Sequence, residues 1–112
     1  MIPDGVEKIG MFAFNKCRNL VQVTLPASVA CIDSNAFYYC FALTSVVIPE
    51  GVGIIEKDTF KGCSALASVT LPKRIKFIKE GAFWGCKNLM IYADNLYVES
   101  FAKSEKIPCV KK

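Results

Sequence analysis

Histidine is absent from the 112-residue chain, and no apolar run approaches the ~18–20 residues that a membrane-spanning helix needs. Without histidine, the sequence lacks the commonest general base, the usual serine–histidine and cysteine–histidine nucleophile pairs, and most types of zinc site. The start of the chain has neither a basic segment nor an apolar stretch, so it does not look like a secretory signal peptide. We therefore expect no membrane insertion, and the chain is either intracellular or a mature or truncated piece of a longer protein.

The chain also has little net charge. Its 14 lysine and arginine residues against 10 aspartate and glutamate residues give a net charge of +4. The basic residues are scattered, and the terminal pair Lys111 and Lys112 is too short to form a nucleic-acid-binding or membrane-binding arm. Hydrophobic residues make up 53% of the chain, which is typical of a folded protein. The composition therefore predicts one folded domain that does not bind nucleic acid.

What the sequence does contain is an internal repeat with a period of 23 residues and no insertions. Seven positions of the repeat unit carry the same or similar residues in four successive copies. The rows are Pro3, Pro26, Pro49 and Pro72; Val6, Val29, Val52 and Ile75; Ile9, Ile32, Ile55 and Ile78; Ala13, Ala36, Thr59 and Ala82; Phe14, Phe37, Phe60 and Phe83; Cys17, Cys40, Cys63 and Cys86; and Leu20, Leu43, Leu66 and Leu89. This pattern predicts a solenoid, in which stacked copies bury their apolar faces against one another.

Each copy contains segments that predict short extended pieces. Alternating residues at 23–25, 46–48 and 69–71 indicate strands with one buried face, and a proline follows each of them because proline cannot donate to a ladder. The V-x-x-I segment predicts a second extended piece. The A-F-x-x-C-x-x-L segment has spacings of three and four, which fits one turn of helix or a 3₁₀ turn. Equivalent strands of successive coils are then expected to pair in parallel.

Six cysteines could form disulfides or bind a metal, but their placement favours packing. The four cysteines of the repeat row are expected to point into the core as small hydrophobic side chains. Their parallel Cβ directions disfavour disulfides, and their long regular gaps do not match the short ligand spacings of a zinc site. Cys31 lies outside the row and is expected to be partly exposed, whereas Cys109 lies near the C-terminus.

Over roughly residues 2–90 the repeat unit reads I-P-x-x-V-x-x-I-x-x-x-A-F-x-x-C-x-x-L. This motif and its 23-residue period resemble the BspA-type leucine-rich repeats of bacterial and some protist surface proteins. Thr59, in the alanine row, is a small departure from the motif. The resemblance implies an α/β solenoid, a right-handed leucine-rich repeat coil with short parallel strands. It also implies about four repeats over residues 1–90, the first one incomplete, and a C-terminal cap over residues 91–112.

The cap is indicated by residues that leave the repeat. Ile91 to Ala93 predict a strand, and Asp94 stands where proline would stand if one residue were deleted. Asp94 or Asn95 is expected to be the N-cap of a helix of ~8–10 residues, with a final short strand over 107–110. This order is similar to the terminal cap of the same family. The N-terminus has no such cap, so we expect either a longer natural protein or self-association through this edge.

Function is expected at positions where the repeat varies. Tyr38, Tyr39, Phe41 and Trp84 are large aromatics at positions where other copies carry polar residues, and Phe77 lies in a row that is apolar in its last three copies. Exposed aromatics of this kind often anchor protein or glycan ligands. The competing interpretation is that these side chains pack on the convex side of the solenoid or against a missing neighbouring segment.

No pattern in the sequence predicts catalysis. The sequence has no glycine-rich phosphate loop and no nucleophile elbow, and a four-coil solenoid offers no deep cleft for a pair of catalytic carboxylates. We therefore expect no enzyme, and no catalytic, cofactor or metal site. The resemblance implies a protein-interaction or adhesion module in the C-terminal part of a bacterial surface or secreted protein. Its partner would be a host or bacterial surface protein, with a glycan as an alternative. The remaining alternatives are a structural spacer and an intracellular scaffold without its own ligand.

Overall fold

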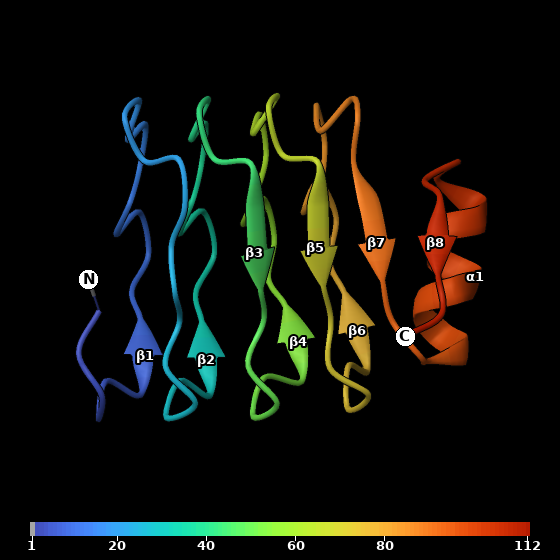
Figure 1. Cartoon of the computed structure of the whole chain (residues 1–112), viewed down its shortest axis with the longest axis horizontal. Coiled ribbons are helices and arrows are strands. Elements are labelled where there is room, and N and C mark those ends of the chain that lie inside the picture. Colours follow the sequence, from blue (N-terminus) through green and yellow to red (C-terminus); the bar gives the residue numbers. More distant parts are fainter. Residues whose placement is uncertain (1) are drawn as a thin grey trace.

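Each copy of the repeat forms one coil of a parallel solenoid in the computed structural model, which describes residues 2–112 (Figure 1). We number the coils 1 to 4, for residues 2–20, 21–43, 44–66 and 67–89. The N-terminus lies at one end of the solenoid, and helix α1 (Leu96–Ser104) lies at the other. Met1, the first residue of the expected repeat region, lies outside the described residues.

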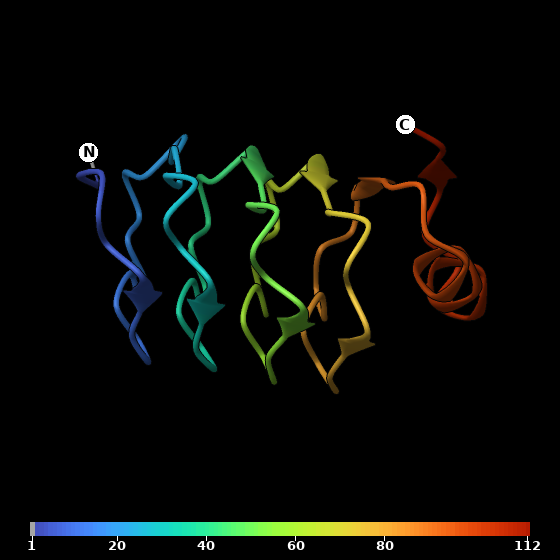
Figure 2. The same ribbon diagram turned by 90° about the horizontal axis from the view of Figure 1, so that it is seen from below.

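Two rows of short strands run along the solenoid, and every strand pair is parallel. One row is a four-stranded sheet of order β3-β5-β7-β8, formed by Ser45–Val47, Ser68–Thr70, Met90–Tyr92 and Cys109–Val110. The other row contains the pairs β1-β2 and β4-β6, formed by Lys8–Ile9 with Cys31–Ile32, and by Ile54–Ile55 with Phe77–Ile78. Figure 2 shows the two rows as separate layers. The predicted solenoid with parallel strands and a 23-residue period is therefore confirmed.

The strand register follows the repeat and then changes once. Val46 pairs with Val69, 23 residues later, whereas Val69 pairs with Ile91, only 22 residues later. One residue is therefore missing from the last coil, as the sequence predicts. The shift continues the four-stranded sheet into β7 and lets the chain turn away into α1 in place of a fifth coil.

Two local predictions were only partly right. The expected strand over 23–25 is reduced to one isolated bridge between Gln22 and Ser45. The A-F-x-x-C segment does form i→i+3 hydrogen bonds, with Cys40 N donating to Phe37 O at 3.2 Å, but only at every second residue, so it is a series of turns and not a continuous 3₁₀ turn. It does not form a helix, because residues on both sides of the alanine–phenylalanine pair adopt left-handed backbone angles, such as φ 60° at Asn35 and 54° at Tyr39.

The phenylalanine row forms a continuous stack through the core. Neighbouring rings of Phe14, Phe37, Phe60 and Phe83 are nearly parallel, with centroid distances of 5.0, 5.3 and 5.7 Å. Phe101 of α1 closes the stack, with its ring 6.3 Å from Phe83 and tilted by 58°. The 23-residue period places one ring in each coil, so stacking and burial act between every pair of neighbours.

Three cysteines of the row, Cys40, Cys63 and Cys86, are buried beside these rings, which confirms the packing interpretation for them, whereas Cys17 is half-buried. Each of the three buried thiols donates to the phenylalanine carbonyl of the preceding coil: Cys40 to Phe14 at 2.9 Å, Cys63 to Phe37 at 3.1 Å, and Cys86 to Phe60 at 3.3 Å. Cysteine is small and apolar, and its thiol is a weak hydrogen-bond donor. It therefore fills this core position and also donates a hydrogen bond to a buried main-chain carbonyl. The departure at Thr59 is also accommodated, because its hydroxyl donates to Glu56 O at 2.8 Å.

The cap replaces the missing fifth coil with side-chain contacts. Asn95 is the N-cap of α1 and accepts from Val98 N at 3.0 Å, while its Nδ2 donates to Lys73 O and Ile75 O at 2.8 Å each. The Tyr97 hydroxyl accepts from Ile78 N at 3.0 Å. Helix α1 thus covers the edge of β6, and β8 pairs with β7.

Candidate functional site

Three of the five aromatic residues predicted from the sequence lie together at one end of coil 2. Tyr38 and Tyr39 pack edge to face with ring centroids 4.5 Å apart, and Tyr39 and Phe41 lie 5.6 Å apart. The two tyrosines are half-buried, and Phe41 is 44% exposed. They lie on the edge of the solenoid where each coil turns from its second extended piece back to its first, at the top of Figure 1.

Phe12 belongs to the same group, although the sequence analysis did not single it out. Its ring packs edge to face on Tyr38 at 6.1 Å and is 47% exposed. It adopts φ 59°, which is unusual for a bulky residue. The equivalent residues are Asn35, Asp58 and Gly81, so a comparison along this row would have identified Phe12 as the one aromatic. We call Phe12, Tyr38, Tyr39 and Phe41 the aromatic cluster.

The cluster includes a small hollow and a basic side chain. Lys16, Tyr38, Tyr39 and Phe41 line a hollow of about 360 Å³. Gly62 of the next coil makes room for the Tyr39 ring, because a Cβ at this position would collide with that ring. The hollow is within the range of small ligand sites, and its chemistry is aromatic with one positive charge at the edge.

The other two predicted aromatics lie elsewhere. Phe77 is on β6 in the second row of strands, 51% exposed and paired with the exposed Ile54 of β4. Trp84 is 60% exposed near the capped end of the solenoid, where Lys61 Nζ lies 5.2 Å from its ring centroid. The structure therefore divides the five residues among three surfaces.

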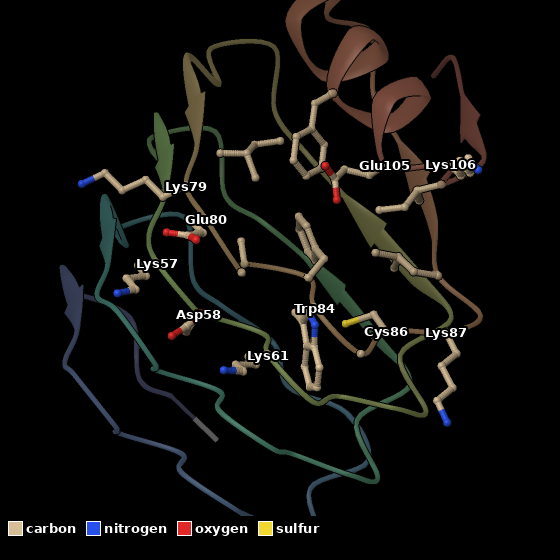
Figure 3. Close-up of a pocket in the computed structure, with 18 of the residues that line it drawn as sticks. Lys57, Asp58, Lys61, Lys79, Glu80, Trp84, Cys86, Lys87, Glu105 and Lys106 are labelled. Atoms are coloured by element: carbon tan, nitrogen blue, oxygen red, sulfur yellow. The ribbon is translucent and has the colours of Figure 1, made fainter.

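A larger cavity of about 930 Å³ lies between coil 4 and the cap (Figure 3). Its apolar lining includes Phe83 and Trp84 from the coil, and Phe101, Ile107 and Pro108 from the cap. Figure 3 shows Lys61 beside Trp84, with Glu105 and Lys106 of the cap across the cavity. The sequence analysis did not predict this cavity. It arises because the cap covers the strands of coil 4 but leaves its turn open.

The thiols differ strongly in their surroundings. Burial raises the pKa of Cys86 to about 12, and the neighbouring Cys40 thiol together with burial raises the pKa of Cys63 above its ordinary value of 9.0. Cys31 and Cys109 are half-buried, as expected for the former. Burial also raises the pKa of Cys109, with a smaller contribution from Glu99. Cys63 and Cys86 are therefore core thiols that remain protonated at neutral pH.

We expect these thiols to differ in alkylation by iodoacetamide at pH 8. Cys31 should react first in the folded protein. Cys86 should react far more slowly, because a pKa of about 12 leaves very little thiolate at pH 8 and the core excludes the reagent. Mass spectrometry of the labelled peptides, with and without denaturant, measures both rates. Equal labelling of Cys31 and Cys86 in the folded protein would contradict this account of the core.

Within residues 2–112, no group of three or more cysteine, aspartate or glutamate side chains is arranged to hold a metal ion. In the same range, α1 has only nine residues, and no helix has the length and apolar character needed to cross a bilayer.

The stacked coils, the parallel strands and the regular core define a leucine-rich repeat solenoid. A family model described as a BspA type leucine rich repeat region (6 copies) matches residues 1–107. The chain therefore belongs to the BspA-type leucine-rich repeat family. This fold generally serves as a protein-interaction module, and its members are typically not enzymes. None of the curated proteins matches the chain.

Solved structures agree with this assignment. A leucine rich cell surface protein from Faecalibacterium prausnitzii is 35% identical, with a TM-score of 0.79, over 83% of this chain and 25% of that one. A leucine-rich repeat protein from Bacteroides ovatus is 34% identical, with a TM-score of 0.73, over 96% of this chain and 29% of that one. The T. pallidum leucine rich repeat protein is 28% identical, with a TM-score of 0.65, over 80% of this chain and 54% of that one. The chain thus spans about a quarter to a half of the length of these proteins.

Proposed function

We propose that the chain binds a partner protein through the aromatic cluster. The observation that carries this proposal is the grouping of four aromatic rings on one exposed edge of an otherwise regular solenoid. Regular rows maintain the fold, whereas these side chains depart from their rows and add little to the core. Tyrosine and phenylalanine are common anchors in protein interfaces because each contributes a large, rigid contact area.

The proposal places the chain in a bacterial surface or secreted protein, as part of its C-terminal region, with residues 1–90 as repeats and 91–112 as the cap. The similarity to a protein described as a leucine rich cell surface protein supports this placement. The partner would then be a host or bacterial surface protein. Treatment of intact producing cells with a protease tests the location, since only a surface-exposed chain is degraded without lysis.

Replacing both Tyr38 and Phe41 with alanine tests the binding site. We expect at least about tenfold weaker binding to the partner, because central aromatic anchors commonly contribute 2 kcal/mol or more. Binding is measured by surface plasmon resonance against a purified partner isolated with the unmodified chain. Circular dichroism and thermal unfolding of the variant verify that it remains folded.

Phe77→Ala is the matched control, because Phe77 is an equally exposed aromatic on the other strand row. It should leave the affinity unchanged. A folded double variant that binds as tightly as the unmodified chain would refute the site. A chain that binds no protein or glycan would favour the spacer or scaffold hypotheses.

A further inference from the structure

Three alternating amide groups in the turn of each middle coil hold the next coil in place. In coils 2 and 3 these amides donate to main-chain carbonyls of the following turn, with N···O distances of 2.7 to 3.2 Å. The pairs are Asn35 to Lys57, Phe37 to Thr59 and Tyr39 to Lys61, followed by Asp58 to Glu80, Phe60 to Ala82 and Gly62 to Trp84. The turn edge of each coil therefore presents a row of main-chain donors, one at every second residue, to the carbonyls of the next turn.

The equivalent amides of coil 4 have no such partner. Gly81, Phe83 and Gly85 occupy the same row, and within residues 2–112 their N–H groups donate to no acceptor. In the described part of the chain, the carbonyl of Phe83 also lacks a cysteine thiol donor such as each preceding phenylalanine carbonyl of the row has. These N–H groups are therefore open to a ligand that supplies hydrogen-bond acceptors.

The open amide row lies along the 930 Å³ cavity between coil 4 and the cap, with Gly81, Phe83 and Gly85 all in its lining. A volume of this size falls within the range of specific ligand sites. Trp84 adds a largely exposed ring at the same turn, and Ile107 and Pro108 add apolar surface from the cap. Polar donors and apolar contacts therefore converge on one space.

The shape of this space favours an extended peptide over a second copy of the chain. Helix α1 packs on β6, and β8 pairs with β7, so the positions that the strands of a docking coil would need are filled. Only the turn remains open. An extended segment presents carbonyls on one side at every second residue, and the open donors likewise alternate along the chain, at 81, 83 and 85. Peptide addition to an open main-chain edge is a common recognition mode.

The charges around the cavity favour an acidic segment. Five lysines line it against three carboxylates, and among the lysines only Lys79 is in an ion pair in the described structure, with Glu56 at 2.9 Å. Lys61 and Lys87 flank the Trp84 and Gly85 end of the donor row, whereas Asp58 lies against Gly81 at the other end. Acidic side chains are therefore best placed near Lys61 and Lys87.

We propose that the chain binds an extended, acidic peptide segment in this cavity, with main-chain carbonyls of the peptide accepting from the amides of Gly81, Phe83 and Gly85. The site is separate from the aromatic cluster, and neither proposal depends on the other. The Tyr38→Ala and Phe41→Ala double variant should bind the peptide as the unmodified chain does, so failure of one site is distinguishable from failure of the other.

The probe is a synthetic peptide of alternating glutamate and threonine, acetylated and amidated at its ends, of about ten residues so that it exceeds the span of the donor row. It is titrated into ¹⁵N-labelled protein and followed by NMR. We expect the amide signals of Gly81, Phe83 and Gly85 to shift and their hydrogen exchange to slow, because new hydrogen bonds form there. A lysine–threonine peptide of the same length should cause neither change.

Charge reversal tests the same site from the protein side. The Lys61→Glu and Lys87→Glu double variant should bind the acidic peptide about tenfold more weakly, whereas Lys76→Glu with Lys103→Glu, which changes the net charge equally away from the cavity, should not. The proposal is wrong if the three amides do not respond, if both double variants lose affinity equally, or if inorganic phosphate alone reproduces the shifts. Shifts that grow with protein concentration and without peptide would assign the cavity to a second copy and likewise overturn it.

Discussion

Replacing Phe60 with alanine is expected to lower the free energy of unfolding by about 3–5 kcal/mol, the largest effect of any substitution considered for this protein. Phe60 is fully buried, and its ring stacks on Phe37 at 5.3 Å and on Phe83 at 5.7 Å. Removal of the ring leaves a cavity between two coils and interrupts the stack on both sides. Because neighbouring coils stabilise one another in a solenoid, the loss reaches both halves of the molecule.

Thermal and urea unfolding followed by circular dichroism measure this effect, and a fall in Tm of more than about 10 °C is expected. Two variants serve as controls. Phe14→Ala should cost less, because Phe14 is half-buried and has a stacking neighbour on one side only in the described structure. Phe77→Ala removes an exposed ring and should change stability by less than about 1 kcal/mol. Equal losses for Phe60→Ala and Phe77→Ala would show that the stack does not stabilise the fold.

Asn95→Ala is expected to cost about 2–3 kcal/mol, the second largest effect, because this one side chain makes three hydrogen bonds. Its oxygen caps α1 at Val98 N, and its nitrogen donates to the carbonyls of Lys73 and Ile75 in coil 4. The substitution therefore weakens the helix and detaches it from the solenoid in one step. Urea unfolding gives the change, and faster hydrogen exchange in 96–104 locates it.

Asn95→Ser separates the two roles of this side chain. Serine can still cap the helix but cannot reach both carbonyls, so about half of the loss should remain. Ser104→Ala is the control at the other end of α1, where one exposed hydrogen bond to Phe101 O is removed, and it should cost less than about 0.5 kcal/mol. If Asn95→Ala proves as mild as Ser104→Ala, the cap is not attached in the way that the hydrogen bonds indicate.

The core was predictable because the same buried side chains recur at the same position of every repeat. A row of phenylalanines or cysteines at constant spacing can be buried in each copy only if the copies stack in register, which fixes a parallel solenoid. The same reasoning located the missing residue before β7 and narrowed the N-cap of α1 to two residues, of which the structure has Asn95. The turn was less predictable from any single coil, because the left-handed Tyr39 is bulky, and the glycine signal appears only along its row, at Gly62 and Gly85.

The candidate sites required tertiary structure. Departure from a row identifies Tyr38, Phe41, Phe77 and Trp84 equally well, but it does not say that they lie on different surfaces. Phe12 joins the aromatic cluster only because its own coil stacks against coil 2. The five predicted aromatic residues are therefore indistinguishable in the sequence, but they lie on three separate surfaces of the molecule.

The sequence by itself determined the period, the parallel stacking, the buried rows and the presence of a helical cap, because these depend on which residues recur and on their size and polarity. Only the tertiary structure decided which residues make up the two proposed binding sites. The aromatic cluster depends on contacts between coils, and the open amides of Gly81, Phe83 and Gly85 depend on how much of coil 4 the cap covers. Main-chain donors are present in every residue but proline, so only the position of neighbouring chain segments shows which of them remain unpaired.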